Sequence, residues 1–288
     1  MEVKRIFVVG AGTMGNGIAQ TAAVSGYQVS MSDISQELLD RGMKTITSSV
    51  EKLAAKDKIT EAQKQAALQI NTSLDLERAR EADLVIEAAT ENPELKLELF
   101  AQLDQLAPQG AVLASNTSSI SLTKIGAATK RPDAVIGMHF FNPVPLMKLL
   151  EVVRGLATSD ETTQTAIEVG RRMGKEPVEA KDSPGFISNR ILCPMINEAI
   201  YALQEGIGTA DAIDTVMRLG MNHPMGPLAL ADLVGLDVVL FVMEVLHRDL
   251  GEDKYRPCPL LRKMGRRRGG HLISCDQLRT NCIILEVS

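Results

Sequence analysis

The chain has 288 residues and a formal net charge of −5, and 45% of its residues are hydrophobic. A small net charge with an ordinary apolar fraction argues against a disordered or fibrous protein. Only 3% of the residues are aromatic and there is no Trp, so few side chains are available to stack on bases and we expect no nucleic-acid partner. The length is compatible with one large domain or with two.

The N-terminal residues and the cysteines predict a cytoplasmic protein. Residues 1–5 lead directly into a short apolar run, without the stretch of about 7–15 apolar residues that a signal peptide has. The four Cys residues form no Cys-x-x-Cys pair and have no His at zinc-ligand spacing, so we expect reduced thiols and no metal. The most apolar segment, 228–246, contains Asp232, Asp237 and Glu244, which are costly in hydrocarbon. We therefore predict a long buried helix there and no membrane partner.

Short apolar runs rich in Val and Ile alternate with helical patterns in the first part of the chain. This alternation predicts an α/β fold of the Rossmann type, with a mostly parallel sheet that is covered by helices on both faces. The near-continuous apolar run from Ile6 to Val9 suits a strand that is buried on both faces. The predicted strands are 5–9, 28–32, 83–88, 111–114, 134–138 and 149–153, and the predicted helices are 16–25, 36–55, 93–106 and 159–173.

The pattern changes at Pro184 and Gly185, after which every segment is helical in period. We predict a nucleotide-binding domain over 1–184 and a smaller all-α domain over 185–288. The helix expected at 228–246 is apolar nearly all round, which is more apolar surface than so small a domain should bury alone. The sequence therefore predicts a homodimer that is formed through the helical domain. The helices before it are expected at 187–205, ending at Gly206, and at 210–219, with Thr209 as N-cap.

Residues 10–15, Gly-Ala-Gly-Thr-Met-Gly, form a G-x-G-x-x-G pattern between a predicted strand and a predicted helix. Such glycines make the tight turn, let the backbone approach a pyrophosphate and let helix and strand pack closely. Helix N-terminal amides then face the phosphates. Glycine clusters often only make turns, but here Asp33 follows about 20 residues on, where a carboxylate bonds the ribose of NAD. No Arg adjoins it, which favours NAD over NADP; an ordinary loop cap is the alternative for Asp33. The cofactor-binding residues predicted in the turn are Gly10, Gly12, Thr13, Met14 and Gly15.

His139 is the candidate acid and base. Hydride transfer from an alcohol needs a group that takes the hydroxyl proton near neutral pH, which favours His. Of the four His residues, only His139 ends a predicted strand of the nucleotide-binding half, and ligands of open α/β sheets bind at the carboxyl ends of strands. Glu151 lies within the next apolar strand, where a carboxylate needs a partner. If the two strands are neighbours, Glu151 orients the imidazole and stabilises its protonated form; an ion pair with a Lys or Arg is the alternative.

A cluster of hydroxyl and amide side chains, from Ser115 to Ser119, follows another predicted strand. Clusters of this kind normally cap a helix, but this one also has a position from which it could line the same crevice. Asn189 lies just past the predicted boundary and could reach back across the cleft. Spacing alone leaves both roles open.

Together these segments resemble the short-chain 3-hydroxyacyl-CoA dehydrogenases, and the bacterial 3-hydroxybutyryl-CoA dehydrogenases in particular. The resemblance covers about residues 3–264 and rests on six motifs in order: GAGTMGNGIAQ from Gly10, EAATENPELK from Glu87, SNTSSIS from Ser115, HFFNPVPLMKLLEVV from His139, KDSPGFISNRI from Lys181 and HPMGPLALADLVGLD from His223. It implies an oxidoreductase that uses NAD to interconvert a 3-hydroxyacyl-CoA thioester and the 3-ketoacyl-CoA.

The resemblance also implies roles for individual residues. His139 is the expected catalytic acid and base with Glu151 as its partner, and Ser118 and Asn189 are expected to hydrogen-bond the substrate. Residues that match contacts to coenzyme A are Ser49 and Lys56, for which a solvated helix face is the alternative. Asp33 is expected at the adenosine ribose of NAD. Glu91, Lys96 and Asn142 are expected near the nicotinamide, and we expect Asn116 to bind the cofactor as well.

The resemblance ends after Met264, where the family continues with a Tyr-bearing segment that this chain lacks. Residues 265–288 are therefore atypical, as after a change of reading frame in the gene. Five of the seven residues 262–268 are basic, and we expect a solvated tail. Two alternatives stay open: a non-catalytic NAD(H)-binding protein disabled by its tail, and a β-hydroxy acid dehydrogenase of free acids, which needs a cation for the carboxylate.

Overall fold

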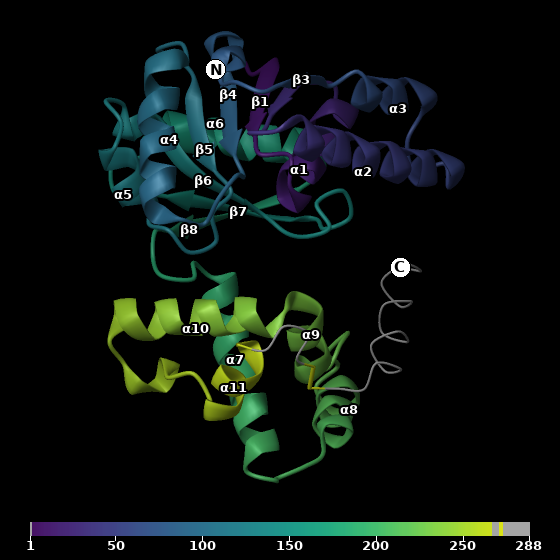
Figure 1. Cartoon of the computed structure of the whole chain (residues 1–288), viewed down its shortest axis with the longest axis vertical. Coiled ribbons are helices and arrows are strands. Elements are labelled where there is room, and N and C mark those ends of the chain that lie inside the picture. Colours follow the sequence, from purple (N-terminus) through teal and green to yellow (C-terminus); the bar gives the residue numbers. More distant parts are fainter. Residues whose placement is uncertain (1, 267–270, 273–288) are drawn as a thin grey trace. The chain divides into compact units, whose positions relative to one another are not determined.

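The computed structural model describes residues 2–266 and 271–272, and the chain divides into two compact units, 1–183 and 184–288 (Figure 1). The first unit combines a sheet with covering helices. Its strands are β1 (Arg5–Val9), β2 (Gln28–Ser32), β3 (Asn71–Ser73), β4 (Leu84–Glu87), β5 (Val112–Ser115), β6 (Val135–Phe140), β7 (Leu149–Arg154) and β8 (Glu176–Lys181). Its helices are α1 (Thr13–Val24), α2 (Gln36–Ala55), α3 (Glu61–Leu68), α4 (Pro93–Leu106), α5 (Leu122–Ala127) and α6 (Asp160–Arg172), with short 3-10 turns at Glu77–Glu81 and Pro132–Ala134.

Within the described residues, the strands form one eight-stranded sheet in the order β3-β2-β1-β4-β5-β6-β7-β8. Strands β1 to β6 are parallel to one another, β7 runs antiparallel to β6, and β8 is parallel to β7. The strand order reverses between β1 and β4, which is the switch point of a doubly wound sheet. The predicted fold, a Rossmann-type sheet with a second all-α part, is confirmed.

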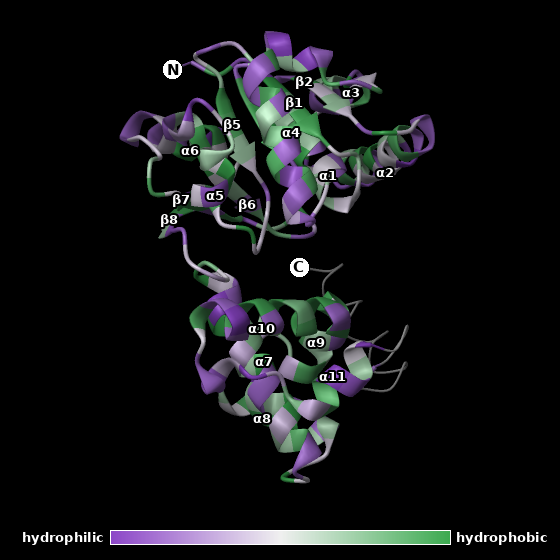
Figure 2. Cartoon of the chain, turned by 60° about the vertical axis from the view of Figure 1, so that its left-hand side comes forward, coloured by the Kyte–Doolittle hydropathy of each residue, from purple (hydrophilic) through white to green (hydrophobic). Residues whose placement is uncertain are grey.

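Alternation along the strands builds two cores, one on each face of the sheet. Ile6 and Val8 pack in one cluster with residues of α1, α2 and α6. Phe7 points to the opposite face, where Phe100 and Leu103 of α4 are fully buried. Figure 2 shows the corresponding hydrophobic strands β1 and β5 beneath mixed helices. A sheet buried on both faces explains the near-continuous apolar runs.

Elements that lack a strong apolar pattern were not predicted. Strand β3, at one edge of the sheet, consists of three polar residues that are exposed or half-buried. Strand β8, at the other edge, contains Pro177 and three charged residues. Pro is tolerated on an edge strand because its missing amide is not needed there. Helix α3 begins with a capping box between Thr60 and Gln63, a signal that was present in the sequence.

The second unit consists of helices around their own core. They are α7 (Ser188–Gln204), α8 (Ala210–Gly220), α9 (Pro227–Val234), α10 (Leu236–Leu250) and α11 (Pro259–Gly265), with a 3-10 turn at Asp253–Tyr255. Buried residues of α7, α9, α10 and α11 form one cluster. The Thr209 side chain accepts a hydrogen bond from the Ala212 amide and caps α8, as expected.

The prediction of a single long helix over 228–246 is wrong. Gly235 has a φ of +102°, which no helical residue adopts, and it separates α9 from α10. Helix α10 is also not apolar all round, because Val239 and Met243 are buried while Asp237 is exposed. The residues that a continuous helix would have stacked in one rod therefore belong to two helices.

The described part of the chain has no helix long and apolar enough to cross a membrane. Two of the cysteines, Cys193 and Cys258, are buried and have free thiols. The other two, and most of the atypical segment 265–288, lie outside the described residues.

Candidate active site

The carboxyl ends of four parallel strands meet at one edge of the sheet. The register places Val9, Glu87, Ser115 and Gly137 on one row across β1, β4, β5 and β6. His139 lies two residues beyond the end of this row, on β6. The glycine turn, the loop with Glu91 and the hydroxyl cluster all begin directly after it. Most of the predicted site residues of the first unit are therefore grouped at one edge.

His139 and Glu151 face each other across two neighbouring strands. They are register partners in the antiparallel pair of β6 and β7, and the His139 Nδ1 lies 2.8 Å from Glu151 Oε2. Both are buried, with His139 7% and Glu151 2% exposed, so the carboxylate acts in a low dielectric. The partner of Glu151 is thus the imidazole that the sequence singled out. A carboxylate at Nδ1 leaves Nε2 as the ring nitrogen for proton exchange with a substrate.

The glycine turn has the shape that a dinucleotide requires. Gly10 has a φ of +104°, and a Cβ there would lie 2.6 Å from the Ala88 carbonyl oxygen. A Cβ on Gly15 would overlap the Gly10 carbonyl oxygen, whereas one on Gly12 would project into open space. Helix α1 begins at Thr13 with no side-chain cap among the described residues, so its first amides point towards that space. The residues present fit the pyrophosphate of NAD.

Asp33 is bonded to the glycine turn itself. Its Oδ2 accepts a hydrogen bond from the Ala11 amide at 2.7 Å, and its Oδ1 accepts one from the Ile34 amide at 2.7 Å. The carboxylate therefore caps this loop and also stands at the carboxyl end of β2, where an adenosine ribose is expected. Its contact with NAD stays a prediction.

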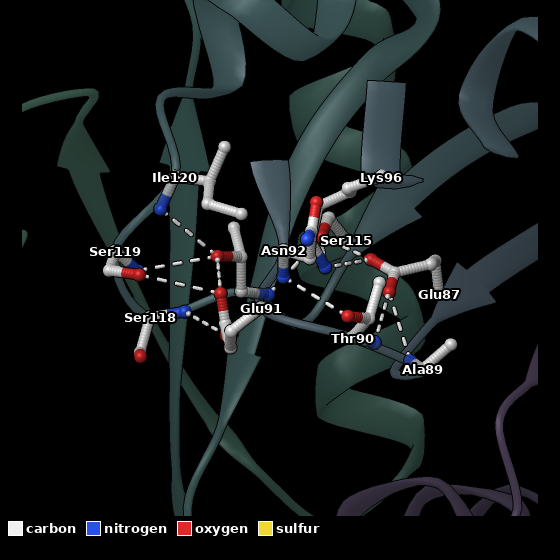
Figure 3. A network of polar contacts seen from close by, with 11 residues as sticks. Glu87, Ala89, Thr90, Glu91, Asn92, Lys96, Ser115, Ser118, Ser119 and Ile120 are labelled. Atoms are coloured by element: carbon white, nitrogen blue, oxygen red, sulfur yellow. Dashed lines mark hydrogen bonds and ion pairs between the residues drawn. The ribbon is translucent and has the colours of Figure 1, made fainter. Parts of the chain in front are cut away.

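Glu91 fastens the segment that carries Ser118 (Figure 3). One carboxylate oxygen accepts from the Ser118 amide at 3.1 Å, and the other accepts from the Thr117 hydroxyl at 2.8 Å. The Ser119 hydroxyl lies within hydrogen-bond distance of the same second oxygen. Glu91 itself is exposed. Through these hydrogen bonds it joins the loop predicted to bind the cofactor to Ser118, which is predicted to bind the substrate.

Lys96, predicted near the nicotinamide, is buried inside the first unit. It is 1% exposed, and its ammonium forms an ion pair with Glu87 and lies 3.4 Å from the Ser115 hydroxyl. The sequence reasoning missed Glu87. The signal was available, because Glu87 ends the apolar run from Leu84 and a carboxylate in such a strand needs a partner, as Glu151 does.

Asn116 joins the ends of two strands beside His139. Its side-chain Oδ1 accepts a hydrogen bond from the Phe140 backbone amide at 2.9 Å, and its backbone amide donates one to the Glu87 carbonyl at 2.7 Å. Asn142 is exposed in the connection between β6 and β7. Both lie at the edge where the cofactor is expected, and both roles stay predictions.

The two residues predicted to contact coenzyme A lie seven positions apart near the end of α2. The Ser49 hydroxyl accepts from the Gln20 side chain of α1 at 2.9 Å. Lys56 is the exposed C-cap of α2. A spacing of seven places both on one helix face.

Asn189 lies in the first turn of α7, in the second unit. Its predicted contact with the substrate stays a prediction. The described residues contain no group of three or more His, Cys, Asp or Glu side chains that could hold a metal ion.

A doubly wound sheet, a turn shaped for a dinucleotide and a buried His–Glu pair at the same edge define a nicotinamide-dependent dehydrogenase. Family models match the chain in two consecutive parts: 3-hydroxyacyl-CoA dehydrogenase, NAD binding domain, over residues 5–183, and 3-hydroxyacyl-CoA dehydrogenase, C-terminal domain, over residues 185–269. The chain belongs to the 3-hydroxyacyl-CoA dehydrogenase family. The predicted family, the predicted oxidoreductase class and NAD as cofactor are thereby confirmed.

Individual relatives agree with this membership. A probable 3-hydroxybutyryl-CoA dehydrogenase of Bacillus subtilis is 56% identical over 264 residues, which cover 91% of this chain and 92% of that protein. The mitochondrial hydroxyacyl-coenzyme A dehydrogenase of Homo sapiens is 42% identical over 271 residues, covering 91% of this chain and 86% of that protein. The crystal structure of (S)-3-hydroxybutyryl-CoA dehydrogenase from Ralstonia eutropha is similar with a TM-score of 0.90 and 50% identity, covering 94% of this chain and 98% of that one.

Proposed function

We propose that the chain is an NAD-dependent dehydrogenase that interconverts 3-hydroxybutyryl-CoA and acetoacetyl-CoA. The observation that carries the proposal is the buried His139–Glu151 pair, joined at 2.8 Å, at the sheet edge that also holds the glycine turn. The names of the bacterial relatives support a short acyl chain. Bound NAD supplies the acceptor for the hydride that leaves C3 of the substrate.

His139 exchanges the proton of the 3-hydroxyl group. In the oxidative direction its Nε2 takes the hydroxyl proton while C3 loses its hydride, and the product is a 3-ketoacyl thioester; in reduction the same nitrogen returns the proton to the carbonyl oxygen. The imidazolium that forms on oxidation is stabilised by the Glu151 carboxylate at Nδ1. The carboxylate also keeps the ring in one orientation.

Ser118 and Asn189 hydrogen-bond the substrate oxygen in this proposal, and Asn142 and Asn116 line the cofactor side. The position of Ser118 is supported by the Glu91 carboxylate that holds its amide. Lys56, exposed at the end of α2, offers a positive charge to the phosphates of coenzyme A, with Ser49 on the same helix face. A thioester with an anionic carrier therefore suits this unit better than a small free acid does.

A homodimer through the helical unit is part of the proposal. Val238 and Phe241 of α10 are 47% and 43% exposed, and Val216 and Leu219 of α8 are 59% and 81% exposed. On each helix the two exposed side chains are three residues apart and so share one face, and exposed apolar faces of this kind favour an interface. Sedimentation of the purified protein tests the homodimer; a monomer at micromolar concentration contradicts it.

A cytoplasmic location is also part of the proposal, and the free thiols of Cys193 and Cys258 agree with it.

A steady-state assay tests the reaction itself. We expect NADH oxidation with acetoacetyl-CoA, weaker activity with NADPH, and none with free acetoacetate. Chains of about four to about ten carbons are compared, since one methylene in an apolar pocket is worth about 1–3 kcal/mol. Activity on free acetoacetate alone would indicate a dehydrogenase of free acids. NADH binding without any oxidation would indicate a non-catalytic protein.

A further inference from the structure

Glu87 is a fully buried carboxylate at the end of β4, and the reaction described above gives it no role. It is 0% exposed. Its Oε1 accepts hydrogen bonds from the Ala89 amide at 2.9 Å and the Thr90 amide at 3.3 Å. Its Oε2 accepts from the Lys96 ammonium and from the Ser115 hydroxyl (Figure 3). Both oxygens of Glu87 are therefore committed to neighbouring elements.

One oxygen of Glu87 fixes the backbone that lies against the glycine turn. A Cβ on Gly10 would lie 2.6 Å from the Ala88 carbonyl oxygen and 2.9 Å from the Ala89 Cα. The segment that Glu87 holds by its amides is thus in close contact with the first glycine of the dinucleotide turn. A shift of this segment would displace the turn or open a gap beside it.

The other oxygen of Glu87 leads to the substrate side. The Ser115 hydroxyl, which donates to Glu87, also accepts from the Thr117 amide at 3.2 Å. The Thr117 hydroxyl donates to Glu91 at 2.8 Å, and Glu91 holds the Ser118 amide. A continuous series of polar contacts therefore runs from Lys96 through Glu87 to Ser118.

We propose that Glu87 is a positioning residue of the dehydrogenase site, which with Lys96 sets the nicotinamide-side wall of the NAD pocket and the Ser118 segment. A buried ion pair is a weak source of stability, because the cost of removing both charges from water offsets their attraction. Its benefit lies in geometry, since each lone pair that Glu87 uses fixes a different segment. The role assigned to Glu87 rests on the proposed function, because it supposes NAD and a thioester at this edge.

The same helix offers a matched control. Asp104, in the last turn of α4, forms a partly buried ion pair with Arg131, with Nε and Oδ1 2.6 Å apart and side-chain exposures of 5% and 16%. Lys96 lies in the first turn of α4, at the carboxyl edge of the sheet. Losing either carboxylate breaks an ion pair of α4, but only the loss of Glu87 disturbs the cofactor edge.

The test compares Glu87→Gln with Asp104→Asn in the full chain. The dissociation constant of NADH is measured by fluorescence titration without substrate, and the KM of acetoacetyl-CoA, kcat and the thermal midpoint are measured beside it. We expect Glu87→Gln to raise the dissociation constant about tenfold or more, because a displaced pocket wall loses contacts with the bound cofactor and a loss of about 1.4 kcal/mol is a tenfold change in affinity. We expect Asp104→Asn to lower the thermal midpoint and leave NADH affinity within about twofold. An NADH affinity in Glu87→Gln as high as in the wild type, or an equal loss in both variants, overturns the proposal.

Ser115→Ala covers the case in which Glu87→Gln does not fold. It removes the hydroxyl that joins Glu87 to Thr117 but leaves the Glu87–Lys96 pair in place, so we expect a rise in the NADH dissociation constant of about threefold. An unchanged constant contradicts the proposal. Because binding is measured without turnover, the result does not depend on the substrate. A wild-type protein that binds NADH but does not oxidise it would instead contradict the proposed function alone.

Discussion

The two units of the chain bury their carboxylates against different partners. In the first unit, Glu151 faces an imidazole and Glu87 faces an ammonium, both at the carboxyl edge of the sheet. In the helical unit, Asp214 of α8 accepts hydrogen bonds from the Leu228 and Ala229 amides at 2.8 and 2.9 Å, at the start of α9. The first arrangement places charges beside each other, and the second completes a helix end. Burial of an acid alone therefore does not distinguish a chemical role from an architectural one; its partner does.

Gly226 shows how the helical unit arranges this cap. It is the N-cap residue of α9 and has no side chain to bond the first amides. A Cβ there would lie 2.2 Å from the Asp214 Cγ, so the carboxylate of α8 occupies the place of a capping side chain. We expect loss of Glu151 to change kinetics and loss of Glu87 to change NADH binding, whereas loss of Asp214 should change stability.

The largest effect is expected from His139→Ala. Without the imidazole no side chain at this position can exchange the hydroxyl proton, and general acid–base catalysis contributes about 10²–10⁴-fold, so kcat should fall by about that factor. The dissociation constant of NADH should change little, because the variant leaves the glycine turn intact. Kinetics with acetoacetyl-CoA and NADH titration measure the two quantities. Near-native kcat would show that another group is the acid.

Glu151→Gln should have a smaller effect on the same step. An amide keeps the size of the side chain but cannot stabilise the imidazolium by charge, so kcat should fall about tenfold or more. The thermal midpoint is measured in parallel, because a structural defect would lower the midpoint without lowering the kcat of the folded enzyme. An unchanged kcat would show that Glu151 has an architectural role and not a chemical one.

Asp214→Ala tests the helical unit. It leaves the Leu228 and Ala229 amides without their acceptor, and losing a helix cap costs about 0.5–2 kcal/mol of stability. We expect a lower urea midpoint with kcat within about twofold of the wild type, since a cap defect affects folding and not proton transfer. Asp249→Ala is the control, because Asp249 pairs with the exposed Arg248 and such surface pairs contribute about 0–1 kcal/mol. A midpoint as high in Asp214→Ala as in the control would contradict the role of Asp214 as a cap.

The hydrophobic periodicity of the sequence predicted most of the helices and strands, because it reflects which residues are buried. The bounds of β1, β2, α2 and α4 agree with the expected ranges, since each is a strong apolar or amphipathic run. The edge strands β3 and β8 were not predicted, because edge strands need little apolar surface. The break at Gly235 was not predicted either, because a glycine in an apolar run gives no sign of its φ.

A site residue was predictable from the sequence where a single physical rule applied to that residue alone. A strand-end His and an acid in an apolar strand led to His139 and Glu151, and strand pairing then joined them. The ion pair of Glu87 and Lys96 joins a strand to a helix nine residues further along, and no sequence period links such positions. Sequence motifs show which residues gather at an edge, but not which of them bond each other.

The smallest effect on activity and stability is expected for the Cys193 thiol of the helical unit. Burial raises the pKa of this thiol to about 12, which lowers the thiolate fraction near neutral pH about a thousandfold relative to an ordinary thiol. The folded pKa is higher than the unfolded one, so this burial costs no stability below about pH 9, and the free energy of unfolding falls as the pH rises from there towards about 12. Iodoacetamide labelling with peptide mapping should therefore modify Cys193 slowly in the native protein and rapidly in urea. Rapid native labelling would show that this thiol is accessible, and the helical unit would then hold a reactive group as well as architectural ones.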